Sequence, residues 1–555
     1  MSTNASDLLC TASTFASILP ANATVEKIDW VSSGSSYGEG TLNAGYPTNA
    51  TNLPALCAVT INVTSPQSSA YRFGILLPQN WNSRLLTVGN GGYAGGINWV
   101  DIAAGSRYGF AALSTDTGHN SSASDMTWAL YQPEKRLDWG WRSVHGSVEL
   151  GKKLVAAYYS KPASYSYYSG CSTGGRQGMR EMQNFPQSFD GVMAGAPSWW
   201  LNGIVSWLAK VSQYNWPADT PAHIDWKQLP GLATAVMKQC DGVDGVTDGI
   251  ISDPRKCTVD YSALTCGNSN ANSSTCLTSP QIDLLKKVYE DYVTESGVYV
   301  YPGLITGTES GMASVLNDST GNPYGLGYVR NFLDMANFTI DQYTDSIALQ
   351  ALELDPGQPM ADIYDISQFK DRGGKFVLYQ GLADPLVPAK GSSLYYDRLV
   401  QTMGTNVSGE FFRYFEIPGM DHCSGTGVDA PWHVGQVAAS DSYSVSGFED
   451  AQHDLLLALV DWVEKDKPIQ SIVATTWKSP LNTSSGVLRQ RPICPYPHVA
   501  SWTGVGEINQ PTGWTCRPNA AATTPALTSG VGIEMGVMHH WISFMALILV
   551  FFTTF

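Results

Sequence analysis

Two cysteines lie directly beside the residues of this 555-residue chain that are best suited to catalysis. Cys171 precedes Ser172, and Cys423 follows His422. A disulfide between these cysteines would hold a candidate nucleophile close to its general base, although the two lie far apart in the sequence. The hydroxyl and the imidazole must approach to within about 3 Å for the base to remove the proton. This arrangement indicates a hydrolase.

Ser172 occupies the centre of a Gly-x-Ser-x-Gly pattern that it forms with Gly170 and Gly174. A strand is predicted over 164–169 and a helix over 174–184, and between such elements the pattern forms a tight turn that exposes the serine. Small flanking residues are required because the turn is strained. Ser172 is therefore the predicted nucleophile. The alternative is a glycine-rich turn with an inert serine.

The acid and the histidine of such a catalytic triad follow the serine in the order Ser, Asp, His. Asp384 comes after a predicted strand over 375–380, and His422 comes after a predicted strand over 410–417. This order predicts that Asp384 orients His422, which acts as the general base. Asp421 is the competing acid, but neighbouring side chains in a loop seldom point the same way.

Acyl transfer also requires N–H donors for the oxyanion, one after the nucleophile and one from an early loop. Thr173 supplies the first donor. Gly91 or Gly92, in a glycine-rich segment after the predicted strand 84–88, is the candidate for the second. The segment from Gly89 to Ala94 also matches a dinucleotide-binding fingerprint. The cysteine content disfavours that alternative.

Short apolar runs and amphipathic segments alternate along most of the chain. Strands are also predicted over 71–77 and 108–113, and helices are predicted over 141–159 and 451–464. Such alternation indicates an α/β fold with a mostly parallel sheet and helices on both faces.

The alternation stops between about residues 200 and 368, where Asn, Ser, Gly, Trp and Tyr are frequent. This segment is interpreted as an inserted domain that covers the carboxyl edge of the sheet. The predicted organisation is a core with an N-terminal extension over 1–199, a lid over 200–368, the second part of the core over 369–518, and a linker with a hydrophobic tail over 519–555.

Composition and cysteine count restrict the class and the location of the protein. The net charge of −16 argues against a nucleic-acid partner. Ten cysteines, none in a CxxC pair typical of a zinc site, accompany ten Asn-x-Ser/Thr sequons. Three cysteine pairs are close enough in sequence to close local loops, namely Cys240/Cys257, Cys266/Cys276 and Cys494/Cys516. These features favour secretion, with the signal peptide expected outside this sequence.

The end of the chain is almost wholly apolar from Trp541 to Phe555, which is short for a membrane-spanning helix. Small residues around Ser529 and a spacer over 532–540 precede it. That order is typical of a GPI-attachment signal, with Ser529 as a candidate attachment site. The alternative is a terminal strand or helix docked in the core.

A loop from Cys240 to Ser252 concentrates three carboxylates, those of Asp241, Asp244 and Asp248, among three glycines. Oxygen donors at this spacing can bind Ca²⁺, although the loop lacks the register of an EF-hand. The alternative is a series of Asp-Gly turns closed by cysteines.

Together these motifs resemble the tannase/feruloyl esterase family of secreted fungal serine esterases. The resemblance extends over roughly Leu9 to Pro518 and depends on the segments 89–96, 114–119, 170–178, 240–251 and 419–423. It implies an α/β-hydrolase fold with a large inserted lid, the triad Ser172, Asp384 and His422, and hydrolysis of phenolic-acid esters through an acyl-enzyme.

The resemblance also implies structural details. A structural Ca²⁺ in the lid domain would be bound by the side chains of Asp241, Asp244 and Asp248 and by the carbonyls of Val246 and Ile250. The implied disulfides are Cys171–Cys423, Cys10–Cys57, Cys240–Cys257, Cys266–Cys276 and Cys494–Cys516.

With Thr173 directly after Ser172, the serine motif resembles that of the feruloyl branch of the family more than that of the tannase branch. Hydroxycinnamate esters are therefore the first expected substrates, and gallate esters are the alternative. A surface-anchored binding protein on an inactive esterase scaffold is a third possibility. Such a protein should have lost a member of the triad, and none is missing.

Overall fold

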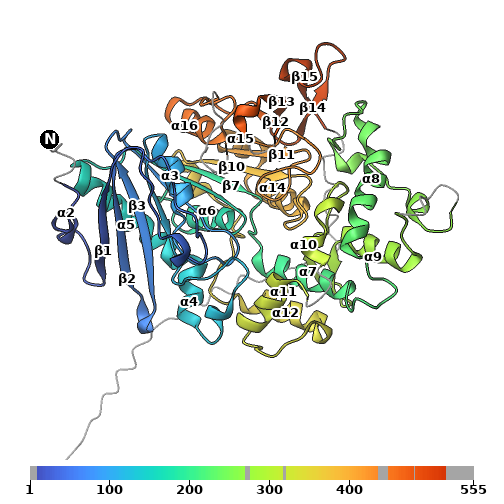
Figure 1. Cartoon of the computed structure of the whole chain (residues 1–555), viewed down its shortest axis with the longest axis horizontal. Coiled ribbons are helices and arrows are strands. Elements are labelled where there is room, and N and C mark those ends of the chain that lie inside the picture. Colours follow the sequence, from blue (N-terminus) through green and yellow to red (C-terminus); the bar gives the residue numbers. More distant parts are fainter. Residues whose placement is uncertain (1–8, 269–274, 317–320, 436–447, 480–481, 520–555) are drawn as a thin grey trace, which may run out of the picture. The chain divides into compact units, whose positions relative to one another are not determined.

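A nine-stranded sheet forms the centre of the computed structural model, which describes residues 9–268, 275–316, 321–435, 448–479 and 482–519 (Figure 1). The strand order is β1-β2-β3-β5-β4-β6-β7-β10-β11. From β5 to β11 all neighbouring strands are parallel. These strands are β4 (Arg84–Val88), β5 (Ala111–Thr115), β6 (Tyr165–Cys171), β7 (Gly191–Gly195), β10 (Lys375–Gly381) and β11 (Phe412–Ile417). The α/β-hydrolase prediction is confirmed.

Three antiparallel strands extend this sheet at its N-terminal edge: β1 (Ala23–Val31), β2 (Leu56–Thr64) and β3 (Ala70–Pro78). Only β3 was predicted from the sequence, and it pairs antiparallel with β5. β2 is buried over most of its length, since its side chains are covered on both faces. The N-terminal extension is therefore part of the same sheet.

Helices cover both faces of the sheet, as predicted. On one face lie α3 (Trp99–Arg107) and α16 (Leu455–Lys465), which share a hydrophobic cluster. The other face carries α5 (Ser143–Tyr159), α6 (Thr173–Asn184) and α14 (Ala389–Met403).

Three predicted boundaries differ from the structure for local reasons. The strand predicted from 108 begins at Ala111, because Gly109 adopts a φ of +82° in the turn after α3. The strand predicted from 410 begins at Phe412, because α15 (Thr405–Phe411) precedes it. The helix predicted from 451 begins at Leu455, where Asp454 caps the first turn by accepting two N–H groups.

Between β7 and β10 the chain is mainly helical, and Figure 1 shows this segment in green to yellow. Its elements share one hydrophobic cluster with α5 and α6. The boundaries of a separate lid domain at 200 and 368 stay a prediction. The elements are α7 (Leu201–Tyr214), α8 (Leu229–Cys240), α9 (Ser279–Tyr289), β8 (Tyr292–Val293), β9 (Tyr299–Tyr301), α10 (Ala313–Leu316), α11 (Pro323–Asn331), α12 (Asp345–Leu354) and α13 (Ser367–Asp371).

The remaining described α-helices and strands are short. They are α2 (Ala12–Ala16), α4 (Pro133–Leu137) and two hairpins after α16, formed by β12 (Ile472–Trp477) with β13 (Val487–Ile493) and by β14 (His498–Trp502) with β15 (Trp514–Pro518).

All ten cysteines form the five disulfides that the resemblance implies. Such a number is typical of proteins from oxidising compartments. The predicted anchor signal, including Ser529 and the segment Trp541–Phe555, lies outside the described residues and stays a prediction, as does glycosylation. Within the described ranges, no helix has the length and apolarity needed to cross a membrane.

Candidate active site

Ser172 lies on the turn between β6 and α6, in the strand–turn–helix context that the sequence predicts. Its backbone adopts φ 62° and ψ −124°. A non-glycine residue at positive φ is strained, and such strain is concentrated at functional sites. The N–H of Ser172 donates to the carbonyl of Gly195 on the neighbouring strand β7 (2.9 Å), which fixes the turn against the sheet.

The glycines around the nucleophile allow backbone segments to approach closely. A Cβ atom at Gly89 would lie 2.5 Å from the Cα of Gly174, and one at Gly170 would lie 2.8 Å from the carbonyl carbon of Gly174. No larger residue fits at such distances. The Gly-x-Ser-x-Gly pattern therefore packs the nucleophile turn against the glycine-rich loop after β4.

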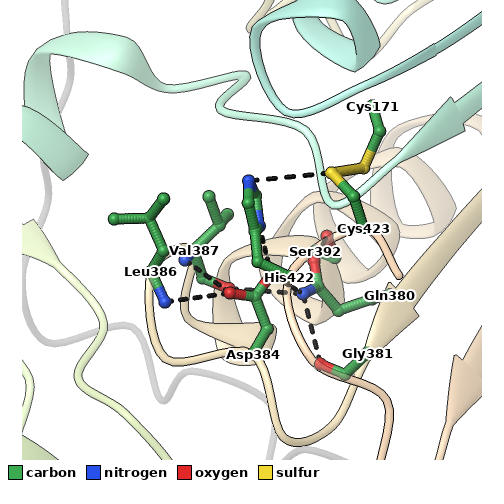
Figure 2. Close-up of a disulfide and its surroundings, with 9 residues drawn as sticks. All are labelled: Cys171, Gln380, Gly381, Asp384, Leu386, Val387, Ser392, His422 and Cys423. Atoms are coloured by element: carbon green, nitrogen blue, oxygen red, sulfur yellow. Dashed lines mark hydrogen bonds and ion pairs between the residues drawn. A yellow bond between two sulfur atoms is a disulfide. The ribbon is translucent and has the colours of Figure 1, made fainter. Parts of the chain in front are cut away.

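Asp384 and His422 form the predicted acid–base pair. The Nδ1 of His422 lies 2.7 Å from Oδ2 of Asp384 (Figure 2). Asp384 is completely buried, and its other oxygen accepts the N–H groups of Leu386 and Val387, both at 2.9 Å. Gln380 donates to Oδ2 from its side chain (3.0 Å). These donors hold the carboxylate in place, so that it fixes the tautomer in which Nε2 of His422 is free to accept a proton.

The competing acid Asp421 does not take this role, since the imidazole of His422 is paired with Asp384. Burial and the charge of Asp384 raise the pKa of Asp421 to about 6. The pairing results from close packing of the two loops: a Cβ atom at Gly381 would lie 2.3 Å from the carbonyl oxygen of Met420.

The disulfide Cys171–Cys423 connects the nucleophile turn to the histidine loop, and its Cα atoms are 5.9 Å apart (Figure 2). The Sγ of Cys423 lies 3.6 Å from Nε2 of His422, so Nε2 faces the bridge that leads to Ser172. Ser172 and His422 both line one cavity. No hydrogen bond joins them within the described part of the chain, as is frequent in unliganded enzymes, where such contacts tighten in the complex.

The cavity has a volume of about 360 Å³, which is in the range of small-molecule sites. Much of its wall is apolar and comes from the helical segment between β7 and β10 and from the loop after β10. These apolar residues are Leu201, Ile204, Val205, Leu208, Leu386 and Val387. Their side chains suit an aromatic acid or its apolar substituents.

All three predicted oxyanion-hole residues, Thr173, Gly91 and Gly92, line this cavity. Thr173 is the first residue of α6, where helical N–H groups have no intrahelical partner. The N–H of Gly91 donates to the hydroxyl of Tyr46 (2.8 Å). The glycine-rich loop is also held by Gln177 of α6, whose Oε1 accepts the N–H of Asn90 (3.0 Å). The predicted donor residues therefore lie together along the cavity wall, with the N–H of Gly91 already bonded to Tyr46.

Sequence reasoning missed several residues of this site. Gln177 is part of the motif over 170–178, so its position in the motif was the available signal. Tyr46 belongs to a loop without a pattern that predicts a function, and Asp101 has the appearance of an ordinary acidic residue in the first turn of α3. Both line the cavity.

The predicted calcium loop contains three carboxylates whose oxygens accept backbone N–H groups. Oδ1 of Asp241 accepts those of Asp248 (3.0 Å) and Gly249 (2.9 Å), and Oδ1 of Asp244 accepts that of Val246 (2.9 Å). Asp248 forms an ion pair with Arg491. Among the described residues, no three His, Cys, Asp or Glu side chains gather as a metal site would require. The donor set has the oxygen chemistry that Ca²⁺ prefers, but its carboxylates do not converge.

Comparisons with known proteins show which family this chain resembles over most of its length. The family described as "Tannase and feruloyl esterase" matches residues 57–516. The chain is 32% identical to feruloyl esterase B of Aspergillus niger over 502 residues, which cover 89% of this chain and 93% of that protein. It is 31% identical to the probable feruloyl esterase B-1 of Aspergillus flavus, over 86% of this chain and 91% of that protein.

Two solved structures are also similar. The crystal structure of feruloyl esterase B from Aspergillus oryzae matches with a TM-score of 0.85 at 30% identity. The match covers 92% of this chain and 100% of the chain in that crystal structure. The tannin acyl hydrolase from Aspergillus niger matches with a TM-score of 0.73 at 20% identity, over 93% and 96% of the two chains, which supports the fold.

Proposed function

The chain belongs to the tannase and feruloyl esterase family and is a carboxylic ester hydrolase for esters of phenolic acids, and from this premise we propose that Ser172, His422 and Asp384 carry out the reaction. The observation that carries the proposal is the pairing of His422 with the buried Asp384. The loop of His422 is in turn joined to the turn of Ser172 by the Cys171–Cys423 disulfide.

In the proposed mechanism, Nε2 of His422 accepts the proton of Ser172 as Oγ attacks the ester carbonyl. Asp384 stabilises the imidazolium that forms. The N–H of Thr173 and that of Gly92, or that of Gly91 once it leaves the Tyr46 hydroxyl, stabilise the negative oxygen of the tetrahedral intermediate. The intermediate collapses, the C–O bond to the alcohol breaks, and His422 donates the proton to the leaving alkoxide. Water then attacks the acyl-enzyme by the same steps and releases the phenolic acid and Ser172.

We propose further that hydroxycinnamate esters are preferred over gallate esters. The wall formed by α7 supports this preference, since Leu201, Ile204 and Val205 can contact the apolar propenoyl group that separates a hydroxycinnamate ring from its carboxyl. A galloyl ring carries three hydroxyl groups and lacks that spacer, so it would leave polar groups against apolar side chains.

The preference predicts that kcat/KM for methyl ferulate exceeds that for methyl gallate by at least about tenfold, since a mismatch of about 1.4 kcal/mol has this effect. Steady-state kinetics with both esters measures it. A higher value for methyl gallate would instead identify a tannase, and hydrolysis of neither ester would favour the inactive binding protein.

We also propose that the loop from Asp241 to Ile250 binds a structural Ca²⁺, through the side chains of Asp241, Asp244 and Asp248 and the carbonyls of Val246 and Ile250. The support is the donor set, in which three carboxylates and two carbonyls lie within one loop that the Cys240–Cys257 disulfide closes. To bind the ion, Asp241 and Asp244 would have to turn from the backbone N–H groups that they accept in this structure. When bound, the ion would neutralise the clustered negative charge. It has no part in the chemical steps.

Removal of calcium is expected to lower the thermal stability of the protein. An ion present at about a hundredfold excess over its Kd stabilises the folded state by about 2.7 kcal/mol. Thermal denaturation in calcium and in chelator should therefore give a Tm several degrees lower in chelator, and Asp244→Asn should abolish the difference. Asp283→Asn, at an exposed position of α9, is the control that should retain it. Identical Tm values in calcium and chelator would contradict the proposal.

A further inference from the structure

One carboxyl group in the cavity has no role in the proposed mechanism. Asp101 lies in the first turn of α3 and lines the same cavity as Ser172. Its Oδ2 accepts a hydrogen bond from the side-chain amide of Asn98 (2.7 Å). Among the described residues, Oδ1 of Asp101 has no hydrogen-bond partner and no cation forms an ion pair with the carboxylate. The wall of the cavity therefore presents an acceptor oxygen that is available to a ligand.

Helix capping alone does not explain this geometry. The side chain of Asn98 caps α3 by accepting the N–H of Asp101 (3.2 Å). In a capping box, the acidic side chain would in turn accept the backbone N–H of the capping residue. Here the carboxylate of Asp101 instead accepts the side-chain amide of Asn98. A half-buried carboxylate without a cation is less favourable than one in water unless hydrogen bonds stabilise it, and desolvation raises the pKa of Asp101 to about 6.

A second polar side chain, that of Tyr46, lines the same cavity as Asp101. Burial raises the pKa of the Tyr46 hydroxyl, and the negative charge of Asp101 contributes to this shift. The hydroxyl therefore stays neutral and accepts the N–H of Gly91 (2.8 Å). We call Tyr46, Asn98 and Asp101 the polar wall. All three residues line the cavity, and Tyr46 also holds the loop of the predicted oxyanion hole, whereas the α7 side of the cavity is apolar.

We propose that Asp101, positioned by Asn98, is a specificity-determining residue that accepts a hydrogen bond from a phenolic hydroxyl group of the acyl moiety. This inference rests on the proposed function. A phenol is a good donor and a carboxylate is a strong, charge-assisted acceptor, and the bond would satisfy Oδ1 in the cavity. An acyl group with its carbonyl at Ser172 and its ring in the cavity would present a ring hydroxyl to the polar wall. Free phenols are then preferred over their methyl ethers, which cannot donate.

The test compares the methyl esters of 4-hydroxycinnamic, 4-methoxycinnamic and cinnamic acid. For the unmodified protein, kcat/KM for the 4-hydroxy ester is expected to exceed that for the 4-methoxy ester by about 10- to 100-fold, as is typical of a hydrogen bond to a charged group. Asp101→Asn retains the size of the side chain and removes its charge. It should lower kcat/KM for the 4-hydroxy ester by about tenfold and leave the cinnamate value unchanged.

Asp283→Asn is the matched control, because it makes the same chemical change at an exposed position of α9 and should retain the selectivity. Equal values for the 4-hydroxy and 4-methoxy esters in the unmodified protein would overturn the inference, and this comparison holds even if the Asp101 variant does not fold. A loss that is equal for the 4-hydroxy ester and cinnamate in Asp101→Asn would also overturn it. Failure to hydrolyse any of the three esters would instead overturn the proposed function.

Discussion

Ser172→Ala is expected to lower kcat for methyl ferulate by at least about 10⁴-fold, as does loss of the nucleophile from a serine triad. The substitution removes the oxygen that would form the acyl-enzyme, and His422 cannot replace it. Stability should change little, because alanine has the same Cβ atom at a φ of 62°, and within the described residues the Ser172 hydroxyl makes no hydrogen bond that would be lost. Steady-state kinetics and a thermal denaturation curve measure the two effects.

Ser147→Ala provides the control for this experiment. The Ser147 hydroxyl is buried in α5, outside the cavity and without a hydrogen-bond partner in the described structure, so the same chemical change occurs in a buried site. Its activity should match that of the unmodified protein. If Ser172→Ala retained turnover, the serine would not be the nucleophile, and another group of the cavity would have to attack the ester.

The residues of the triad could be predicted from sequence because each is part of a local pattern. Gly170 and Gly174 identify the Ser172 turn, since both are required where backbone segments approach closely. Asp384 follows β10, a short apolar run that is typical of a strand buried on both faces of a parallel sheet. His422 follows the edge strand β11, whose aromatic and aliphatic residues still mark it as a strand although it contains Arg413 and Glu416. Chain order then assigns the roles of acid and base. Such signals do not depend on distant residues.

Other parts of the fold lack a local signal. β7 (Gly191–Gly195) is a fully buried strand of five residues, but two of these are glycines and no polar pattern distinguishes it from a loop. The strand β1 alternates charged and apolar residues around Glu26, Lys27 and Asp29, and sequence analysis did not separate it from a loop. The strand β2, by contrast, is rich in β-branched apolar residues, so a local signal for it was present in the sequence and was not used. The helices between β7 and β10 are stabilised by mutual packing of their apolar faces, which composition does not reveal.

The polar wall of the cavity could not be predicted from the sequence for a related reason. Tyr46 and Asp101 come from different segments, and only tertiary packing places both beside the loop after β4. An acidic residue near the start of a helix is so common that Asp101 alone carries no functional signal. The chemistry of bond cleavage is thus encoded locally, whereas the part of the cavity that selects the substrate depends on the complete fold.

Loss of the Cys171–Cys423 disulfide is expected to impair both catalysis and stability. The bridge spans 252 residues of sequence, and in the chain-entropy model a loop of this length stabilises the folded state by about 5 kcal/mol. The bridge also joins the turn of Ser172 to the loop of His422. A displacement of about 1 Å between reacting groups can lower the rate about 100-fold. The double variant Cys171→Ser/Cys423→Ser should therefore have a kcat reduced by about two orders of magnitude, measured well below its own Tm.

The double variant Cys494→Ser/Cys516→Ser separates the two effects. Its bridge closes a loop of 22 residues between the C-terminal hairpins, so its loss should cost about 3 kcal/mol in the same model. That variant should have a lowered Tm but an unchanged kcat below the transition, because neither sulfur contacts the cavity. The comparison therefore distinguishes a positional role from general stabilisation. Equal kcat values in the two double variants would show that the Cys171–Cys423 bridge stabilises the fold without positioning the histidine, and that packing of the Asp384 and His422 loops is sufficient for catalysis.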